Sequence, residues 1–423
     1  MKTIAIAYFF AALPLIIPFS GCKSNKDALP DGQKLYANVE KYVSFGDHRT
    51  GTPANTQTAN WLGEELKKNG YTVNYPEFPL RQYFFNKAAI ISGSDSVSVF
   101  PQWWVNENIS QSVEGRLVHV KPPSVPADLK GKIALIHAPA GEVLQAFRLI
   151  DALAGNGAVA VAVITENPSG DVAAFNAAAK PDPWKIPVAL VASKHSAKLA
   201  DFEAKRQPVR LYIDGTYKDV KGRNVHGTIG TGKKYVVIST PVSGWFICGG
   251  ERGPGIAVWL ELARWAASLK TTDYTFVFTG NSGHETGGVG AHLFLDEFAP
   301  AIEDTHLWIH LGAGLATLAY RQTPDGPVKQ DEADSLRSFF YSDPVENSFK
   351  KAFERTKAQK FNTRERNGGE LLYVAQKGYR RIVGVSYIHP YFHTPIDSAS
   401  TTSPRILEDI TADFQRFILE EIR

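Results

Sequence analysis

The segment from Thr275 to Gly290, TFVFTGNSGHETGGVG, decides the fold. Its β-rich start, Phe276–Phe278, breaks into small and glycine residues, and the adjacent side chains of His284 and Glu285 follow the break. Open α/β sheets place their active sites where strands end in this way. The segment therefore predicts a strand of an α/β sheet with an acid–base pair at its carboxyl end.

The composition is that of a folded globular protein of more than one domain. The chain has 423 residues, of which 43% are hydrophobic and 21% are charged, and this length predicts about two to three domains. The formal net charge is only +3 and there is no run of five basic residues. A partner that is a nucleic acid is therefore not expected.

The first residues have the pattern of an export signal. Lys2 precedes an apolar stretch, and Ser20 and Gly21 stand directly before Cys22. We interpret residues 1–21 as a signal peptide that resembles a bacterial lipoprotein signal, with a lipid on Cys22. A plain secretory signal with an incidental cysteine is the alternative. Residues 22–32 would be a tether, which places the protein at the cell envelope or in the periplasm, anchored to a membrane by the lipid.

The rest of the chain alternates between strand and helix patterns. A helix is expected from Pro53 until Gly70, and another over 256–269, opened by Gly253-Pro254-Gly255. Buried strands are expected at the following ranges: 235–238, 274–278, 307–309 and 382–385. Alternation of this kind predicts an α/β fold with a mostly parallel, helix-covered sheet.

The middle of the chain has a different sequence pattern. Three segments, LKGKIALI at 129–136, GAVAVAV at 157–163 and IPVALVAS at 186–193, resemble the protease-associated domain, a small α/β module. We therefore expect that module at 98–216, inserted into a larger domain. The larger domain would then consist of an N-terminal part at 33–97 and a catalytic part at 217–423.

The larger domain resembles the superfamily of secreted zinc aminopeptidases and glutamate carboxypeptidases. The resemblance rests on SGHETGGVGA at 282–291, GGERGPGIAVWLELARWA at 249–266 and YFHTPIDSAS at 391–400, together with YVVISTPVSG at 235–244 and LWIHLGAG at 307–314. It implies the zinc-exopeptidase fold. In that superfamily two zinc ions share a bridging Asp, and a Glu takes a proton from the water that the metal holds.

Only some of the metal-site residues of the superfamily are matched in this chain. Thr240 occupies the position of the first histidine ligand, and Val242 occupies that of the Asp that supports it. Neither side chain can take over the role of the residue it replaces. His284 stands at the general base. The remaining metal positions are occupied by Glu251 at the bridging Asp, Glu285 at the second Glu, His310 at the second-metal carboxylate and His393 at the final histidine.

The resemblance thus implies at most one tightly bound zinc ion, held by Glu251, Glu285 and His393 with a position open for water. The second site would keep only Glu251 and His310. His284 would handle protons, since a neutral imidazole suits proton transfer near neutral pH. Arg252, next to Glu251, would instead neutralise the charge that zinc once balanced, which argues against a metal.

Three functions remain open from the sequence. The leading hypothesis is an exported metallopeptidase-like hydrolase with an altered site that acts on a peptide or a small molecule. The second is a non-catalytic binding protein on the same fold, and the third is repurposed chemistry such as that of a lyase or a cyclotransferase. Arg252, His389 and Trp245 are the expected substrate-binding residues in each case. Oligomeric state does not follow from the sequence.

Overall fold

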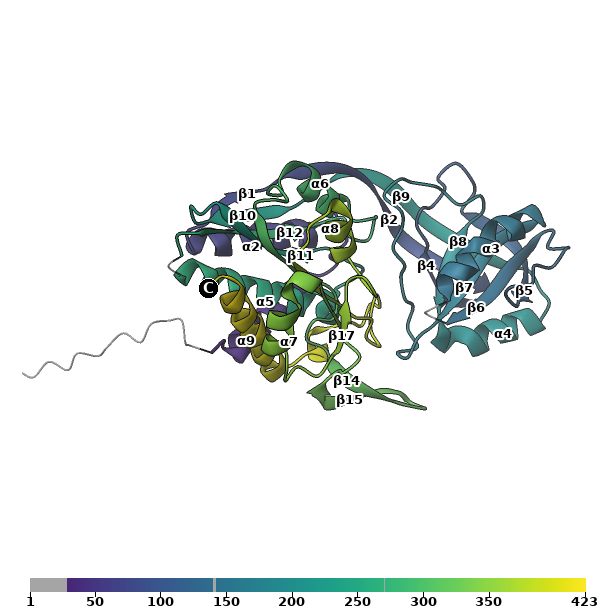
Figure 1. The fold of residues 1–423 in the computed structure, drawn as a ribbon. Coiled ribbons are helices and arrows are strands. Elements are labelled where there is room, and N and C mark those ends of the chain that lie inside the picture. Colours follow the sequence, from purple (N-terminus) through teal and green to yellow (C-terminus); the bar gives the residue numbers. More distant parts are fainter. Residues whose placement is uncertain (1–28, 140–141, 270) are drawn as a thin grey trace, which may run out of the picture.

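The computed structural model describes residues 29–139, 142–269 and 271–423. The signal peptide and most of the tether that we expect at 1–32 lie outside these residues. The described chain forms two bodies, each built on its own large sheet (Figure 1). In the ranges that are described, no helix is both long and apolar enough to cross a membrane.

The first body contains an eight-stranded mixed sheet whose four central strands are parallel. Antiparallel pairs join β1 to β10, β10 to β12, and β18 to β16, and β17 is parallel to β16. In order across the sheet, the strands are β1 (Thr72–Asn74), β10 (Val225–Ile229), β12 (Tyr274–Asn281), β11 (Lys234–Pro241), β13 (Thr305–His310), β18 (Ile382–Ser386), β16 (Ser338–Tyr341) and β17 (Gln359–Asn362).

Helices cover both faces of this sheet. Successive residues of a strand face opposite sides. Accordingly, Val236 and Ile238 pack in the same hydrophobic cluster as the residues of α5 and α9, whereas Val237 packs with α6 and α8. The helices of this body are α1 (Gly32–Ser44), α2 (Pro53–Lys68), α5 (Gly249–Ser268), α6 (Val289–Glu297), α7 (Glu346–Ala352), α8 (Leu371–Lys377) and α9 (Pro404–Glu421).

The second body contains another eight-stranded sheet with α3 (Val143–Gly155) and α4 (Ser196–Ala204). Its long antiparallel pair β2–β9 starts at Glu77 and Arg223 and carries the chain out of the first body and back (Figure 1). In sheet order the strands are β3 (Asp95–Ser98), β2 (Glu77–Ser92), β9 (Val209–Arg223), β5 (Ser112–Val120), β6 (Lys132–Pro139), β7 (Ala158–Glu166), β8 (Val188–Ala192) and β4 (Phe100–Pro101).

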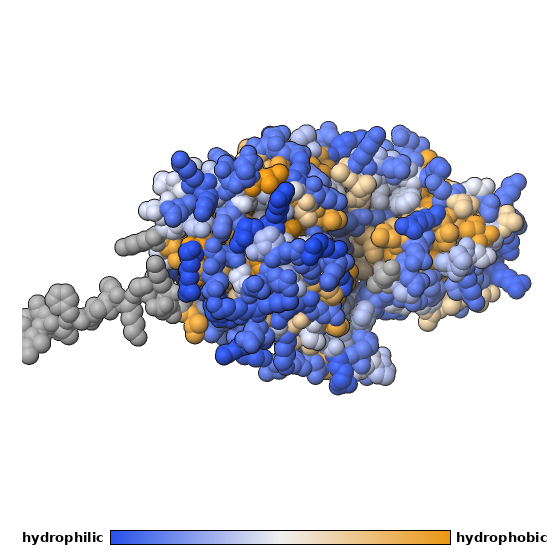
Figure 2. All heavy atoms as spheres, viewed as in Figure 1, coloured by the Kyte–Doolittle hydropathy of each residue, from blue (hydrophilic) through white to orange (hydrophobic). Residues whose placement is uncertain are grey.

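Smaller elements complete the fold. The hairpin β14 (Leu318–Thr323) and β15 (Gly326–Ala333) projects from the first body (Figure 1). The described residues also form short 3₁₀ turns at η2 (Ser193–His195), η3 (Asp343–Val345) and η4 (Ala399–Thr401). On the face shown in Figure 2 the first body is mostly hydrophilic, and hydrophobic residues are more prominent on the second body.

The four buried strands predicted in the first body are confirmed, but the start of α5 differs from the prediction. α5 begins at Gly249, so Pro254 lies inside the helix and does not open it. Gly250 has no room for a side chain, since an added Cβ would lie 1.9 Å from Oγ1 of Thr401. The early turn therefore packs closely against residues distant in sequence, which periodicity does not reveal.

A buried histidine makes the fold sensitive to acid. His226 is 5% exposed, and its ring lies against the edges of Phe294 and Phe298 at centroid distances of 4.7 and 5.1 Å. Burial lowers its pKa to about 3. The unfolded chain takes up this proton near pH 6.5, before the folded chain does. The stability that the fold gains by keeping His226 neutral is therefore fully present above pH 6.5 and is lost as the pH falls toward 3.

We predict that His226→Phe reduces the loss of unfolding free energy between pH 7 and pH 5 by about 2 kcal/mol, because the variant has no imidazole to protonate in the unfolded state. Urea unfolding at the two pH values measures this difference for both proteins. An equal loss in the wild type and in the variant would contradict the prediction.

Candidate functional site

The parallel strands β11, β12 and β13 end at one edge of the first sheet, and the predicted residues gather beyond that edge. Glu251 and Arg252 lie in the first turn of α5, which follows β11. His284 and Glu285 follow β12, and His310 is the last residue of β13. This is the edge at which open α/β sheets bind ligands.

The centre of the site is an ion pair between consecutive residues. Nη2 of Arg252 lies 2.7 Å from Oε1 of Glu251, and the two side chains are 1% and 0% exposed. Nε2 of His393 lies 3.3 Å from the same oxygen, and Nε of Arg252 donates to the carbonyl of Ser243 at 3.0 Å. Burial alone would raise the pKa of Glu251, but the charges of Arg252 and His393 outweigh it and lower the pKa to about 2.

Asp397 fixes the start of α5. Its two carboxylate oxygens accept the backbone N–H groups of Gly250 and Glu251 at 2.8 and 2.9 Å. A carboxylate at a helix N-terminus satisfies unpaired N–H groups and interacts favourably with the helix dipole. Nε2 of the buried His389 lies 3.6 Å from Asp397. His389, expected to bind substrate, is thus buried beside the carboxylate that holds the start of α5.

Each oxygen of the Glu285 carboxylate accepts one hydrogen bond from the protein. One oxygen accepts the backbone N–H of Thr50, and the other accepts the hydroxyl of Ser243 at 2.8 Å. Glu285 is fully buried. Ser243 therefore links the two acidic centres, because its carbonyl receives Arg252 and its hydroxyl donates to Glu285.

His284 pairs with a carboxylate that we did not include among the predicted site residues. Its Nδ1 lies 2.9 Å from Oε1 of Glu370, and the side chains are 16% and 2% exposed. Burial would raise the pKa of Glu370, but the hydrogen bond and charge of His284, followed by the charges of His310 and Arg252, lower it overall. A carboxylate that binds one ring nitrogen orients the imidazole and leaves the other nitrogen for a ligand.

His310 is bound to a hydroxyl through one ring nitrogen, and its Nε2 has no hydrogen-bond partner among the described residues. Its Nδ1 lies 3.0 Å from the hydroxyl of Ser239, which also accepts Nε1–H of Trp308 at 2.9 Å. Burial lowers the pKa of His310 to about 4, so its ring is neutral. A void of about 10 Å³ borders His310 and Glu370, and this is room for about one water molecule.

The other altered positions serve packing. The hydroxyl of Thr240 donates to the carbonyl of Leu311 at 2.8 Å, and Val242 is fully buried in the core of the first body. Trp245 is 1% exposed and belongs to the hydrophobic cluster of the second body, with its ring centroid 4.9 Å from that of Trp103. Trp245 therefore joins the two bodies and presents no surface to a substrate.

A segment of the second body covers the site. The backbone N–H of Ala174 donates to the carbonyl of His393 at 3.0 Å, and Nδ1 of His393 lies 2.9 Å from the carbonyl of Ala174. Ala177 donates to the carbonyl of Glu285 at 2.8 Å. These bonds leave His284 as the most exposed of the charged or titratable side chains described above.

The donor set is not assembled around one point, although both carboxylate oxygens of Glu251 and Nε2 of His310 and of His393 have no hydrogen-bond partner among the described residues. Within the described residues, no group of three or more His, Cys, Asp or Glu side chains is placed to hold a metal ion. The structure brings Glu251 and His393 together, but the Arg252 guanidinium occupies the position beside Glu251. The carboxylate of Glu285 binds Thr50 and Ser243, and His310 binds Ser239.

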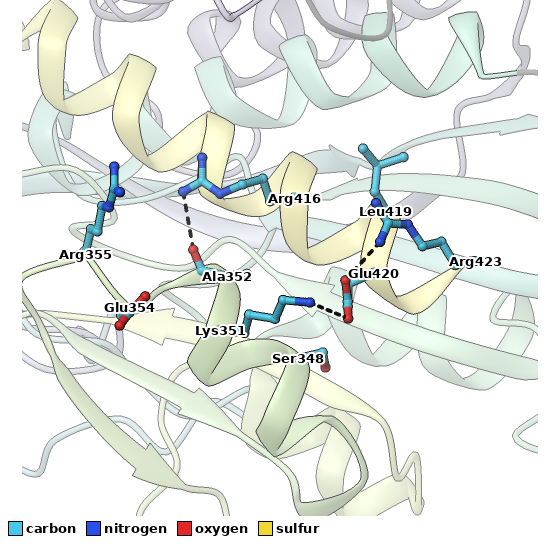
Figure 3. A pocket seen from close by; sticks show the side chains of 9 residues that line it. All are labelled: Ser348, Lys351, Ala352, Glu354, Arg355, Arg416, Leu419, Glu420 and Arg423. Carbon is cyan, nitrogen blue, oxygen red and sulfur yellow. Dashed lines mark hydrogen bonds and ion pairs between the residues drawn. The ribbon is translucent and has the colours of Figure 1, made fainter.

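A surface pocket of about 480 Å³ lies between α7 and α9 (Figure 3). None of the predicted site residues lines it. Its charged side chains include both signs, and Glu420 pairs with Lys351 at 2.9 Å and with Arg423 at 3.5 Å. This pocket is therefore not an alternative to the candidate functional site at the sheet edge.

Solved structures with the same fold include a zinc aminopeptidase, another aminopeptidase and a peptidase precursor. The zinc aminopeptidase of Bacillus subtilis is 16% identical over 94% of this chain and 96% of its own, with a TM-score of 0.75. A peptidase M28 precursor from Shewanella amazonensis SB2B is 17% identical over 93% and 95% of the two chains, with a TM-score of 0.71. The aminopeptidase from Aneurinibacillus sp. strain AM-1 is 18% identical over 93% and 94%, with a TM-score of 0.66.

No protein-family model matches the chain, and no curated protein matches it. The structural likeness covers almost the entire length of each neighbour. The chain therefore has the fold of the zinc exopeptidases, as the sequence motifs predicted. At these identities the likeness establishes the fold and leaves the chemistry to be argued from the site itself.

We predict that Arg252→Met destabilises the fold by about 3–5 kcal/mol, because it leaves the buried carboxylate of Glu251 without its cation. The double variant Glu251→Gln/Arg252→Met should recover part of this loss, since no buried charge then remains unpaired. Denaturant unfolding of the four proteins of this cycle measures the coupling.

The matched control lies on the same helix. Arg264 pairs with Glu261 at 2.5 Å, but Arg264 is 50% exposed. Arg264→Met should therefore cost no more than about 1 kcal/mol. Equal losses for the Arg252 and Arg264 variants would contradict the central role given to the buried pair.

Proposed function

We propose that this chain is a metal-independent binding protein on the zinc aminopeptidase fold. The observation that carries the proposal is the buried ion pair of Arg252 with Glu251. A guanidinium is always charged and has no lone pair to give to a metal. It supplies the positive charge that metal ions would otherwise bring to these carboxylates, and its place beside Glu251 conflicts with a metal that needs the same oxygen.

The single-zinc hydrolase expected from the sequence is correspondingly less well supported. A catalytic zinc needs three protein ligands and an open position for water. Of the three expected ligands, Glu251 is paired with Arg252, and Glu285 accepts hydrogen bonds from Thr50 and Ser243. The ligand that we propose is a peptide or a small molecule that approaches from the side of His284, the most exposed charged or titratable group of the site.

Two further expectations from the sequence belong to this proposal. The pattern around Cys22 supports export and a lipid tether at the cell envelope. The three segments near 129–136, 157–163 and 186–193 support a protease-associated domain as the inserted module. The binding site would then lie on an envelope protein, beneath a segment of that module.

We predict that zinc neither binds with one ion per chain nor stabilises the fold. A ligand at 100 times its dissociation constant raises stability by about 2.7 kcal/mol, so a bound zinc would raise the melting temperature clearly. Metal analysis after dialysis against zinc, and melting curves with zinc or EDTA, make the measurement. Hydrolysis of leucine p-nitroanilide is followed in the same samples, and a zinc aminopeptidase serves as the positive control.

One zinc per chain together with hydrolysis that EDTA abolishes would refute the proposal. Zinc bound by the wild type and lost in Glu251→Gln would do so as well, because it would show that Arg252 yields its position to the metal. Absence of both zinc and hydrolysis would support the proposal.

A second candidate function rests on the pair of His284 and Glu370. A partly exposed imidazole that a buried carboxylate orients at 2.9 Å is the arrangement of a general base. This pair favours proton-transfer chemistry without a metal, such as that of a lyase or a cyclotransferase. The nearby Arg252 would favour negative charge that develops on a ligand.

We predict for this candidate a turnover that persists in EDTA and falls by about 10²-fold or more in His284→Gln, since a general base typically contributes 10²- to 10⁴-fold. A dipeptide panel that includes N-terminal glutaminyl peptides is incubated in ¹⁸O-labelled water and analysed by mass spectrometry. Cyclised or unsaturated products without label support the candidate. Label in the products indicates hydrolysis, and no turnover in the wild type removes the candidate.

A further inference from the structure

We draw no further inference here: the strongest candidate, the hollow beside α9 that Arg355, Arg416 and the exposed Leu29 line, carries side chains of both charge signs, and nothing among the described residues shows what covers it.

Discussion

The ion pair between Glu251 and Arg252 is the constraint on which the rest of the site depends. Two charges removed from water destabilise a protein unless their geometry and their remaining hydrogen bonds compensate. Here the carbonyl of Ser243 receives Nε of Arg252, and His393 approaches the same carboxylate from the last loop. Asp397 holds the turn of α5 that carries the pair. Each partner comes from a different part of the chain, so the pair requires the complete fold.

The acidic side chains of the site differ in how they are paired, since Glu285 accepts two hydrogen bonds whereas Glu251 has only ion-pair contacts. Arg252 pairs with Glu251. Glu285 accepts hydrogen bonds from the hydroxyl of Ser243 and from the backbone N–H of Thr50, and Glu370 is hydrogen-bonded to His284. In a metal centre the ions would supply the charge that makes neighbouring carboxylates compatible. Here the charges of Arg252 and His393 lower the pKa of Glu251, and the hydrogen bond and charge of His284 lower the pKa of Glu370.

The sequence predicts the sheet better than it predicts the site. The strands at 235–238, 274–278, 307–309 and 382–385 are visible because they are continuous apolar runs, and the structure confirms all four. The early start of α5 is not visible, since its cap, Asp397, lies 147 residues from Gly250. For the same reason the sequence does not reveal that Glu370, a candidate substrate contact, orients His284, because the two residues lie 86 positions apart. Motif positions place Glu251, Arg252 and His393 together, but only the structure shows which donor each one meets.

The inserted body determines how the site can be reached. The β2–β9 pair joins it continuously to the first body, and Trp245 packs into its core. Its covering segment makes backbone hydrogen bonds to His393 and Glu285, and substitution of side chains does not remove such bonds. A ligand therefore either approaches by His284 or breaks these bonds by moving the segment.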